Sequence, residues 1–103
     1  MKKLKHKILK IEGTKKRVGD IKSIFQNIEL TYHILHTSLI STNTCVTFLY
    51  SWGHIIIYTF PQDKIITFEF LYPVWEDKIE KIITTLIAIF QPEAHIIKEL
   101  NRC

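Results

Sequence analysis

Two residues, Tyr58 and Glu69, have the types and the spacing expected of a small polar site. They fall in two strand-like segments joined by the turn residues Pro61-Gln62-Asp63, so a hairpin centred there brings them nearly opposite each other on one face. A carboxylate attracts a positively charged ligand, and both groups hydrogen-bond sugar-type hydroxyls. The alternative is a tyrosine packed in the sheet and a glutamate on its wet face. The position of Glu69 between Phe68 and Phe70 weakens that alternative.

The elements that would position this pair follow from the hydrophobic pattern, which predicts the order β-α-β-β-β-β-α-β. Apolar residues recur at helical spacing over 18–28 and again over 79–90, where an acidic pair precedes the helix. Strand-like segments cover 4–12, 30–39, 44–50, 54–60, 64–71 and 94–100, with turns at 41–43 and 61–63. We therefore expect an α+β two-layer sandwich, in which an antiparallel-dominated sheet carries two helices on one face.

The other face of that sheet would lack a helix layer. Ile55, Ile56 and Ile57 are consecutive, so both faces of their strand are expected to be covered. A chain of 103 residues is one small domain, spanning 1–103, that buries a modest core by itself. We therefore expect further copies of the chain to pack against the open face.

Composition argues against several functional classes. The formal net charge is +4, with much of the excess in lysines before residue 18, but no aromatic residue is interleaved among them and no nucleic-acid partner is expected. The two cysteines form no disulfide framework, and no Cys-x-x-Cys or His-Glu-x-x-His pattern indicates a metal. No segment approaches the length of a membrane helix or signal peptide, so we expect a cytoplasmic protein without a membrane partner.

A basic run, Lys15-Lys16-Arg17, leads directly into the first predicted helix. Free N–H groups at a helix start and nearby cations together favour an anion such as a phosphate. Three merely solvated side chains remain the alternative.

The segment from Gly53 to Gln62 resembles the processing-site strand of the small bacterial S-adenosylmethionine decarboxylases. It reads Gly-His-Ile-Ile-Ile-Tyr-Thr-Phe-Pro-Gln, and the family strand reads roughly Glu-Ser-His-Ile-x-Ile-His-Thr-Trp-Pro-Glu. In that family the serine self-cleaves to a pyruvoyl group. Here Trp52 replaces the glutamate, Gly53 the serine and Tyr58 the second histidine, while His54 matches the first. Because glycine has no hydroxyl, the resemblance implies this scaffold without pyruvoyl chemistry.

The resemblance continues over most of the chain, and its N-terminal third matches in outline. Glu69 lies at the place of an aspartate in a family strand that ends Val-Asp-Val-Phe-Thr-Cys, and Pro73 replaces the family's catalytic cysteine. Phe90-Gln91-Pro92-Glu93 is close to the family's usual Phe-x-Pro-Glu corner.

The same scaffold with Tyr58 and Glu69 also resembles the phage-type S-adenosylmethionine lyases and the lyases of the CRISPR-linked messenger SAM-AMP. This resemblance implies a cofactor-free homotrimer with a nucleotide-type ligand between subunits, acting in CRISPR or phage defence signalling. The substrate's own carboxylate would attack its γ-carbon and release methylthioadenosine and homoserine lactone. Tyr58 and Glu69 would be catalytic, with Trp52, Gly53 and His54 at the substrate. The basic run Lys15-Lys16-Arg17 slightly favours the AMP conjugate.

Two other functions remain open at this point. The chain is alternatively a catalytically dead decarboxylase paralogue that binds and regulates a true decarboxylase. It is also consistent with a binding protein for adenosine-type ligands.

Overall fold

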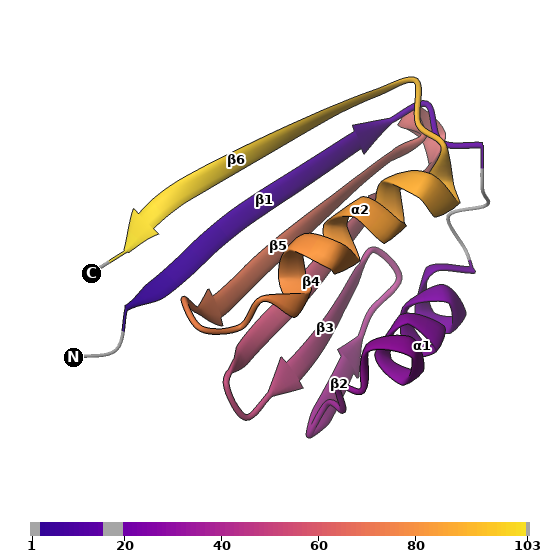
Figure 1. The fold of residues 1–103 in the computed structure, drawn as a ribbon. Helices are drawn as coiled ribbons and strands as arrows, with labels where there is room; N and C mark the ends of the chain where they lie inside the picture. Colours follow the sequence, from indigo (N-terminus) through magenta and orange to yellow (C-terminus); the bar gives the residue numbers. More distant parts are fainter. Residues whose placement is uncertain (1–2, 16–19, 103) are drawn as a thin grey trace.

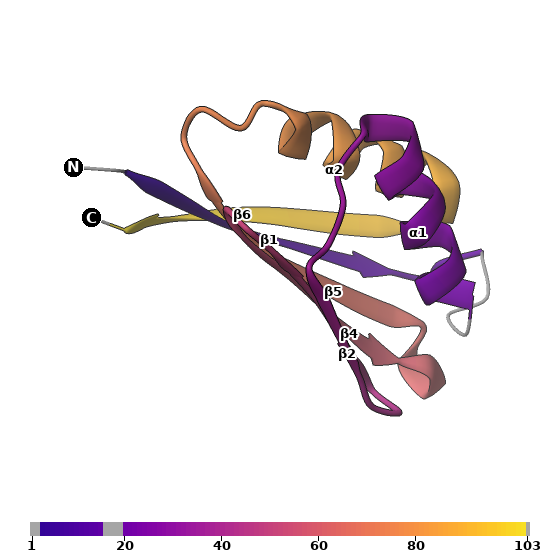
Figure 2. The same ribbon diagram turned by 90° about the horizontal axis from the view of Figure 1, so that it is seen from below.

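An antiparallel sheet with both helices on one face forms the whole fold (Figures 1 and 2). The computed structural model describes residues 3–15 and 20–102. In chain order the elements are β1 (Leu4–Glu12), α1 (Ile21–Tyr32), β2 (Ser38–Ser41), β3 (Cys45–Tyr50), β4 (Gly53–Phe60), the 3-10 turn η2 (Pro61–Asp63), β5 (Ile65–Pro73), α2 (Lys78–Phe90) and β6 (Ala94–Arg102). The six strands are ordered β2-β3-β4-β5-β1-β6. The predicted fold class and element order are confirmed.

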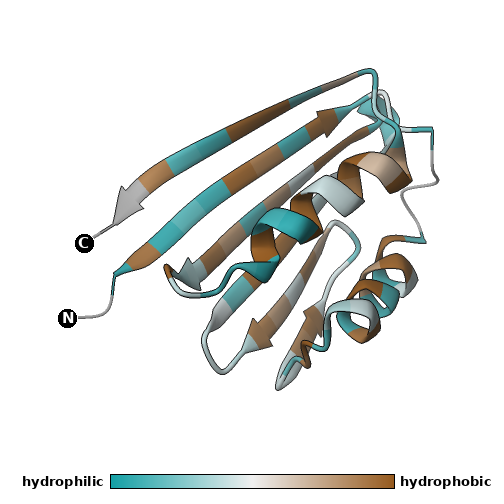
Figure 3. Cartoon of the chain, viewed as in Figure 1, coloured by the Kyte–Doolittle hydropathy of each residue, from teal (hydrophilic) through white to brown (hydrophobic). Residues whose placement is uncertain are grey.

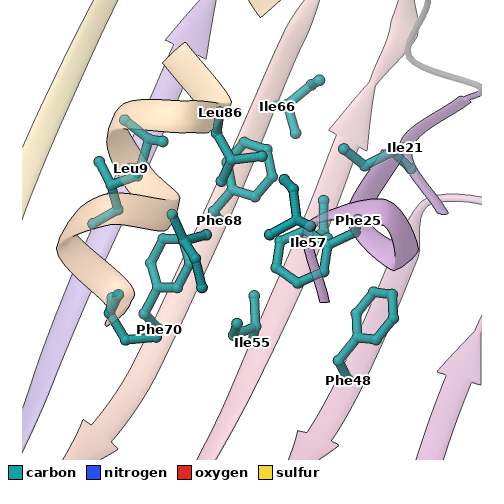
Figure 4. Close-up of a cluster of buried hydrophobic side chains, with 14 of the residues drawn as sticks. Leu9, Ile21, Phe25, Phe48, Ile55, Ile57, Ile66, Phe68, Phe70 and Leu86 are labelled. Atoms are coloured by element: carbon teal, nitrogen blue, oxygen red, sulfur yellow. The ribbon is translucent and has the colours of Figure 1, made fainter. Parts of the chain in front are cut away.

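The helix-covered face of the sheet holds the hydrophobic core. Side chains alternate between the two faces of a strand, so Ile55 and Ile57 of β4 share this face with Phe68 of β5. All three are fully buried, as are Phe25 of α1 and Leu86 of α2 (Figure 4). The apolar face of each helix therefore meets the same layer of side chains, and this burial is the main force that joins the helices to the sheet.

The predicted strand over 30–39 is wrong over 30–37. Helix α1 continues to Tyr32, no strand covers 33–37, and strand β2 is Ser38–Ser41. Threonine, tyrosine and isoleucine there are typical of strands, but Phe25, Ile28 and Tyr32 continue one helical face against the core. The helix ends where His33 adopts the left-handed conformation with φ 57°, and its N–H donates to the carbonyl of Glu29. Tertiary packing has overridden local strand preference here. Val18, where the helix was predicted to begin, lies outside the described residues.

The open face of the sheet carries the alternate side chains of the same strands. We define it by the following residues: Ile40, Thr47, Leu49, His54, Ile56, Tyr58, Phe60, Thr67, Glu69, Leu71, His6, Ile8, Lys10, Ile96, Lys98 and Leu100. Figure 3 shows the alternation along β1 and β6 as successive hydrophilic and hydrophobic bands. Several large apolar side chains on this face are exposed, among them Ile96 at 51 % and Phe60 at 47 %.

The edge strands differ in length. β2 has four residues and β6 has nine, and both are largely exposed. Neither helix in the described part of the chain has the length and apolar character needed to cross a membrane.

Candidate functional site

Tyr58 and Glu69 lie on the open face, near the middle of the sheet. The pairing of β4 with β5 places Tyr58 opposite Thr67, and Ile56 opposite Glu69. Tyr58 and Glu69 are therefore diagonal neighbours, offset by two residues from the directly opposite arrangement. The pKa of the Tyr58 phenol is raised, first because partial burial removes water, and then because of the negative charge of Glu69 and a hydrogen bond to it; Cys45 contributes as well. The charge of Glu69 therefore acts on Tyr58, the group with which it was predicted to act.

A third polar group, His6, completes the site from the other side of Glu69. The pairing of β1 with β5 places His6 opposite Leu71 and Ile8 opposite Glu69, so His6 is also a diagonal neighbour of the carboxylate. Its Nε2 lies 3.4 Å from Glu69 Oε1. His6 is buried, with 8 % of its surface exposed, and the Glu69 side chain is 25 % exposed. A carboxylate therefore lies between a phenol and an imidazole.

Apolar side chains surround this polar group within the sheet. The residues directly opposite Glu69 on the two neighbouring strands are Ile56 and Ile8. Such neighbours keep water away from the sides of the carboxylate and so strengthen its attraction for a cation. The arrangement can hold a positively charged ligand against the sheet while Tyr58 hydrogen-bonds a polar group of that ligand.

Sequence reasoning did not select His6, because the contact joins residues far apart along the chain. The sequence did indicate the face of the sheet on which His6 lies. His6 precedes the core residue Leu9 by three residues in β1, so the two side chains point to opposite faces. Which strands flank β1 could not be read from that pattern.

Of the other residues predicted to lie at the ligand, the structure brings His54 to the same face and leaves Trp52 on the other. His54 is opposite Leu71, and Leu71 in turn is opposite His6. Trp52 instead stacks on Tyr50, with ring centroids 4.6 Å apart and planes 6° from parallel, and Tyr50 is buried on the helix-covered face. Trp52 therefore packs against the core rather than beside Glu69.

Of the predicted basic run, the structure describes Lys15, which lies beside the end of α2. The backbone N–H of Lys15 donates to the carbonyl of Phe90, the last residue of α2, at 3.0 Å. The Lys15 side chain is exposed. Lys16 and Arg17 lie outside the described residues.

A second polar cluster ties α1 to the sheet on the helix-covered side. Glu29 is 5 % exposed and accepts a hydrogen bond of 2.8 Å from the Tyr50 hydroxyl. His36 Nδ1 lies 2.9 Å and 3.0 Å from the two carboxylate oxygens of Glu29. Burial, the hydrogen bond to Glu29 and its charge strongly raise the pKa of Tyr50. The cluster satisfies a carboxylate that would be costly to bury without partners, and the sequence did not reveal it because Glu29 was not expected to be helical.

Comparison with known proteins finds similarity at the level of the fold. No protein-family model matches the chain, and no curated protein matches it. Among solved structures, the crystal structure of the adenosylmethionine decarboxylase from Aquifex aeolicus VF5 is similar, with a TM-score of 0.79. The match covers 98 % of this chain and 91 % of that chain at 16 % sequence identity. The fold is therefore S-adenosylmethionine decarboxylase-like, as predicted from the resemblance.

A serine-type precursor of a pyruvoyl group does not fit at residue 53. A Cβ atom on Gly53 would lie 1.9 Å from the backbone carbonyl oxygen of Leu71, a distance that real Cβ atoms do not adopt. The strands β4 and β5 approach so closely here that only glycine fits. This position therefore lacks both the hydroxyl that a pyruvoyl precursor needs and the space for the side chain that would carry it.

Proposed function

We propose that the chain is a cofactor-free lyase that cleaves S-adenosylmethionine, or its AMP conjugate SAM-AMP, to homoserine lactone and methylthioadenosine or the AMP conjugate of methylthioadenosine. The observation that carries this proposal is that Tyr58 and Glu69 are diagonal neighbours on the open face of an S-adenosylmethionine decarboxylase-like fold. The charge of Glu69 helps to raise the pKa of the Tyr58 phenol. The loss of space for a pyruvoyl group at Gly53 points away from decarboxylation and toward a reaction that needs no electron sink.

In the proposed reaction, the substrate supplies its own nucleophile. Its carboxylate oxygen attacks the γ-carbon as the carbon–sulfur bond breaks, and the electron pair of that bond leaves on sulfur. The sulfonium becomes a neutral thioether, and the new carbon–oxygen bond closes the lactone. No proton transfer is required. The protein contributes by holding the substrate folded, which raises the effective concentration of the carboxylate at the γ-carbon.

The role assigned to Glu69 is to attract the sulfonium, and the role assigned to Tyr58 is to hydrogen-bond a polar group of the substrate. His54, on the same face, would border the ligand. Trp52 is not included, because it stacks on Tyr50 toward the core.

We further propose that the active form is a homotrimer with its sites between subunits. The exposed apolar side chains of the open face support association, since Ile40, Ile96 and Leu100 are each more than 40 % exposed. A second subunit over this face would exclude water from Glu69 and close the site. Light scattering on the purified protein tests this proposal, and a monomer mass at micromolar concentration would contradict it.

The substrate with the added phosphate is slightly favoured. Lys15 is an exposed cation where the chain leaves β1, and Lys16 and Arg17 follow it in sequence. Reversing the charge at these three positions should lower turnover of SAM-AMP much more than turnover of the free compound. If turnover of the two substrates falls equally, these residues do not bind the phosphate, and the lyase proposal is unaffected.

The test of the lyase proposal is product analysis. Purified protein is incubated with each substrate, and chromatography with mass spectrometry measures homoserine lactone and methylthioadenosine. Tyr58→Phe and Glu69→Gln should each lower turnover by about 10²-fold, since a positioned polar group at a reacting centre contributes on this order. Circular dichroism checks that both variants remain folded. Unchanged turnover in both variants would place the active site elsewhere.

A second candidate is a catalytically inactive decarboxylase paralogue that binds and regulates a true decarboxylase. The similarity to a solved adenosylmethionine decarboxylase, together with Gly53, favours it over other binding roles. Ligand binding by the wild-type protein without any product would support this candidate.

A further inference from the structure

We propose that His6 is a positioning residue, which fixes the carboxylate of Glu69 at the centre of the open face. The expected effect of His6 on turnover rests on the proposed function, whereas its effect on the position of the Glu69 carboxylate does not. The observation that carries the inference is the ion-pair contact of the His6 imidazole with Glu69, with Nε2 3.4 Å from Oε1.

Burial makes His6 the fixed partner of this pair. His6 lies on β1, which pairs with β5 on one side and β6 on the other, so its backbone is held by two strands. The His6 side chain is 10 % exposed, whereas the Glu69 side chain is 25 % exposed. The imidazole therefore has little room to move, and the carboxylate takes its orientation from it.

Glu69 depends on diagonal partners because the side chains directly opposite it cannot orient its carboxylate. Ile56 and Ile8 flank it directly and offer no hydrogen bond. Tyr58 lies diagonally across β4 and is the group expected to turn toward the substrate. A glutamate has several rotatable bonds, and holding its carboxylate in one place without a partner costs conformational entropy at each encounter with the ligand. With Oε1 facing His6, the remaining oxygen is left for Tyr58 and a cation.

The consequence is a graded effect on turnover. Groups that orient metal ligands typically contribute about 10–100-fold to activity without touching the substrate, and we expect the same order for a group that orients Glu69. His6→Leu keeps an apolar side chain in the buried space but loses the ring nitrogen. His6→Gln keeps a nitrogen donor at a similar distance from the backbone. We expect His6→Leu to lower kcat/KM about tenfold and His6→Gln to recover most of that loss.

A double-mutant comparison separates positioning from general damage to the fold. If His6 acts through Glu69, His6→Leu has no further effect once Glu69→Gln is present. If His6 acts by itself or only stabilises the sheet, the two losses multiply. His95→Gln, an exposed histidine on β6, is the matched control and should leave kcat/KM unchanged.

Crystal structures of the His6→Leu and His6→Gln variants provide a second measurement that does not depend on turnover. The Glu69 carboxylate should leave its position in the leucine variant and keep it in the glutamine variant. An unmoved carboxylate in the leucine variant, or full multiplication of the two losses, would overturn the role of His6. Absence of product from the wild-type protein with both substrates would instead defeat the lyase proposal, and the crystal structures would still decide on His6.

Discussion

The helix-covered face and the open face are built from the same strands, yet they differ in how their apolar side chains are used. On the covered face, Phe48, Phe68 and Phe70 are fully buried beneath the helices. On the open face, apolar side chains surround a polar group formed by His6, Tyr58 and Glu69. Beneath the helices, the burial of these rings away from water stabilises the fold. The open face places a carboxylate among apolar side chains, an arrangement that stabilises the fold little and favours a charged ligand or a second subunit.

The largest expected effect comes from a substitution in the core beneath the helices. Phe68→Ala removes a fully buried ring from the centre of the core and should lower the free energy of unfolding by about 3–5 kcal/mol. Thr67→Ala, at the next position of β5 on the open face, is the matched control and should cost less than about 1 kcal/mol. Urea unfolding of the two variants measures the difference. Equal losses would mean that the two faces contribute alike.

Gly53→Ala should be the next most damaging change, because its Cβ would meet the Leu71 carbonyl oxygen at 1.9 Å. Relieving the clash requires β4 and β5 to separate locally, which we expect to cost about 3 kcal/mol. Gly13→Ala provides the comparison: its φ of 66° disfavours a side chain, but the atoms in the way belong to the flexible Glu93 side chain. We expect Gly13→Ala to lower the free energy of unfolding by about 1–2 kcal/mol. Thermal unfolding that ranks Gly13→Ala as the worse variant would contradict the close approach.

The next largest loss of stability is expected in the polar cluster of Glu29, Tyr50 and His36 on the helix-covered side. Tyr50→Phe removes the hydrogen bond to buried Glu29 and should cost about 1–3 kcal/mol near neutral pH. The variant should also change the alkaline limb of the stability profile. Because the folded-state pKa of Tyr50 is raised, its contribution is fully present below about pH 10 and is lost as pH rises above that value. Stability measured between pH 8 and 11 should fall less steeply in Tyr50→Phe; an unchanged slope would assign the alkaline loss to other groups.

A charge on the open face should affect association more than folding. Ile96→Lys places an ammonium group on the face proposed to meet another subunit, and we expect association to weaken at least tenfold, about 1.4 kcal/mol. Ile97→Lys puts the same charge on the other face of the same strand, at a side chain that is similarly exposed. Sedimentation of both variants tests the distinction. Dissociation by Ile97→Lys alone would move the interface to the helix side.

The smallest expected effect is spectroscopic. Removing the charge of Glu69 in Glu69→Gln should lower the pKa of Tyr58 toward its ordinary value of 10.0, while the part due to burial remains. Ultraviolet absorbance during an alkaline titration follows phenol ionisation, and Tyr58→Phe identifies which transition belongs to Tyr58. An unchanged transition would show that the two side chains do not interact on the open face.

Much of this fold could be predicted from hydrophobic spacing. The strand over 4–12 agrees with β1, and the helix over 79–90 agrees with α2, because each has a continuous apolar pattern of one period. The segment around Tyr32 was assigned to a strand because its residues favour strands locally. Its helical state depends on the core beneath it and on Tyr50 and His36, which hold Glu29. No local window of sequence contains those partners.

The sequence by itself determined the layer architecture, the element order and the placement of Tyr58 and Glu69 on neighbouring strands, because alternation and helical spacing are local properties and the hairpin joining β4 to β5 is short. Only the tertiary structure decided that β1 pairs with β5, and this pairing brings His6 to the carboxylate across 63 positions of sequence. It also turned Trp52 toward the core and left no room for a side chain at Gly53. These features depend on which strands are neighbours and on how closely their backbones approach, and both are settled when the whole core packs.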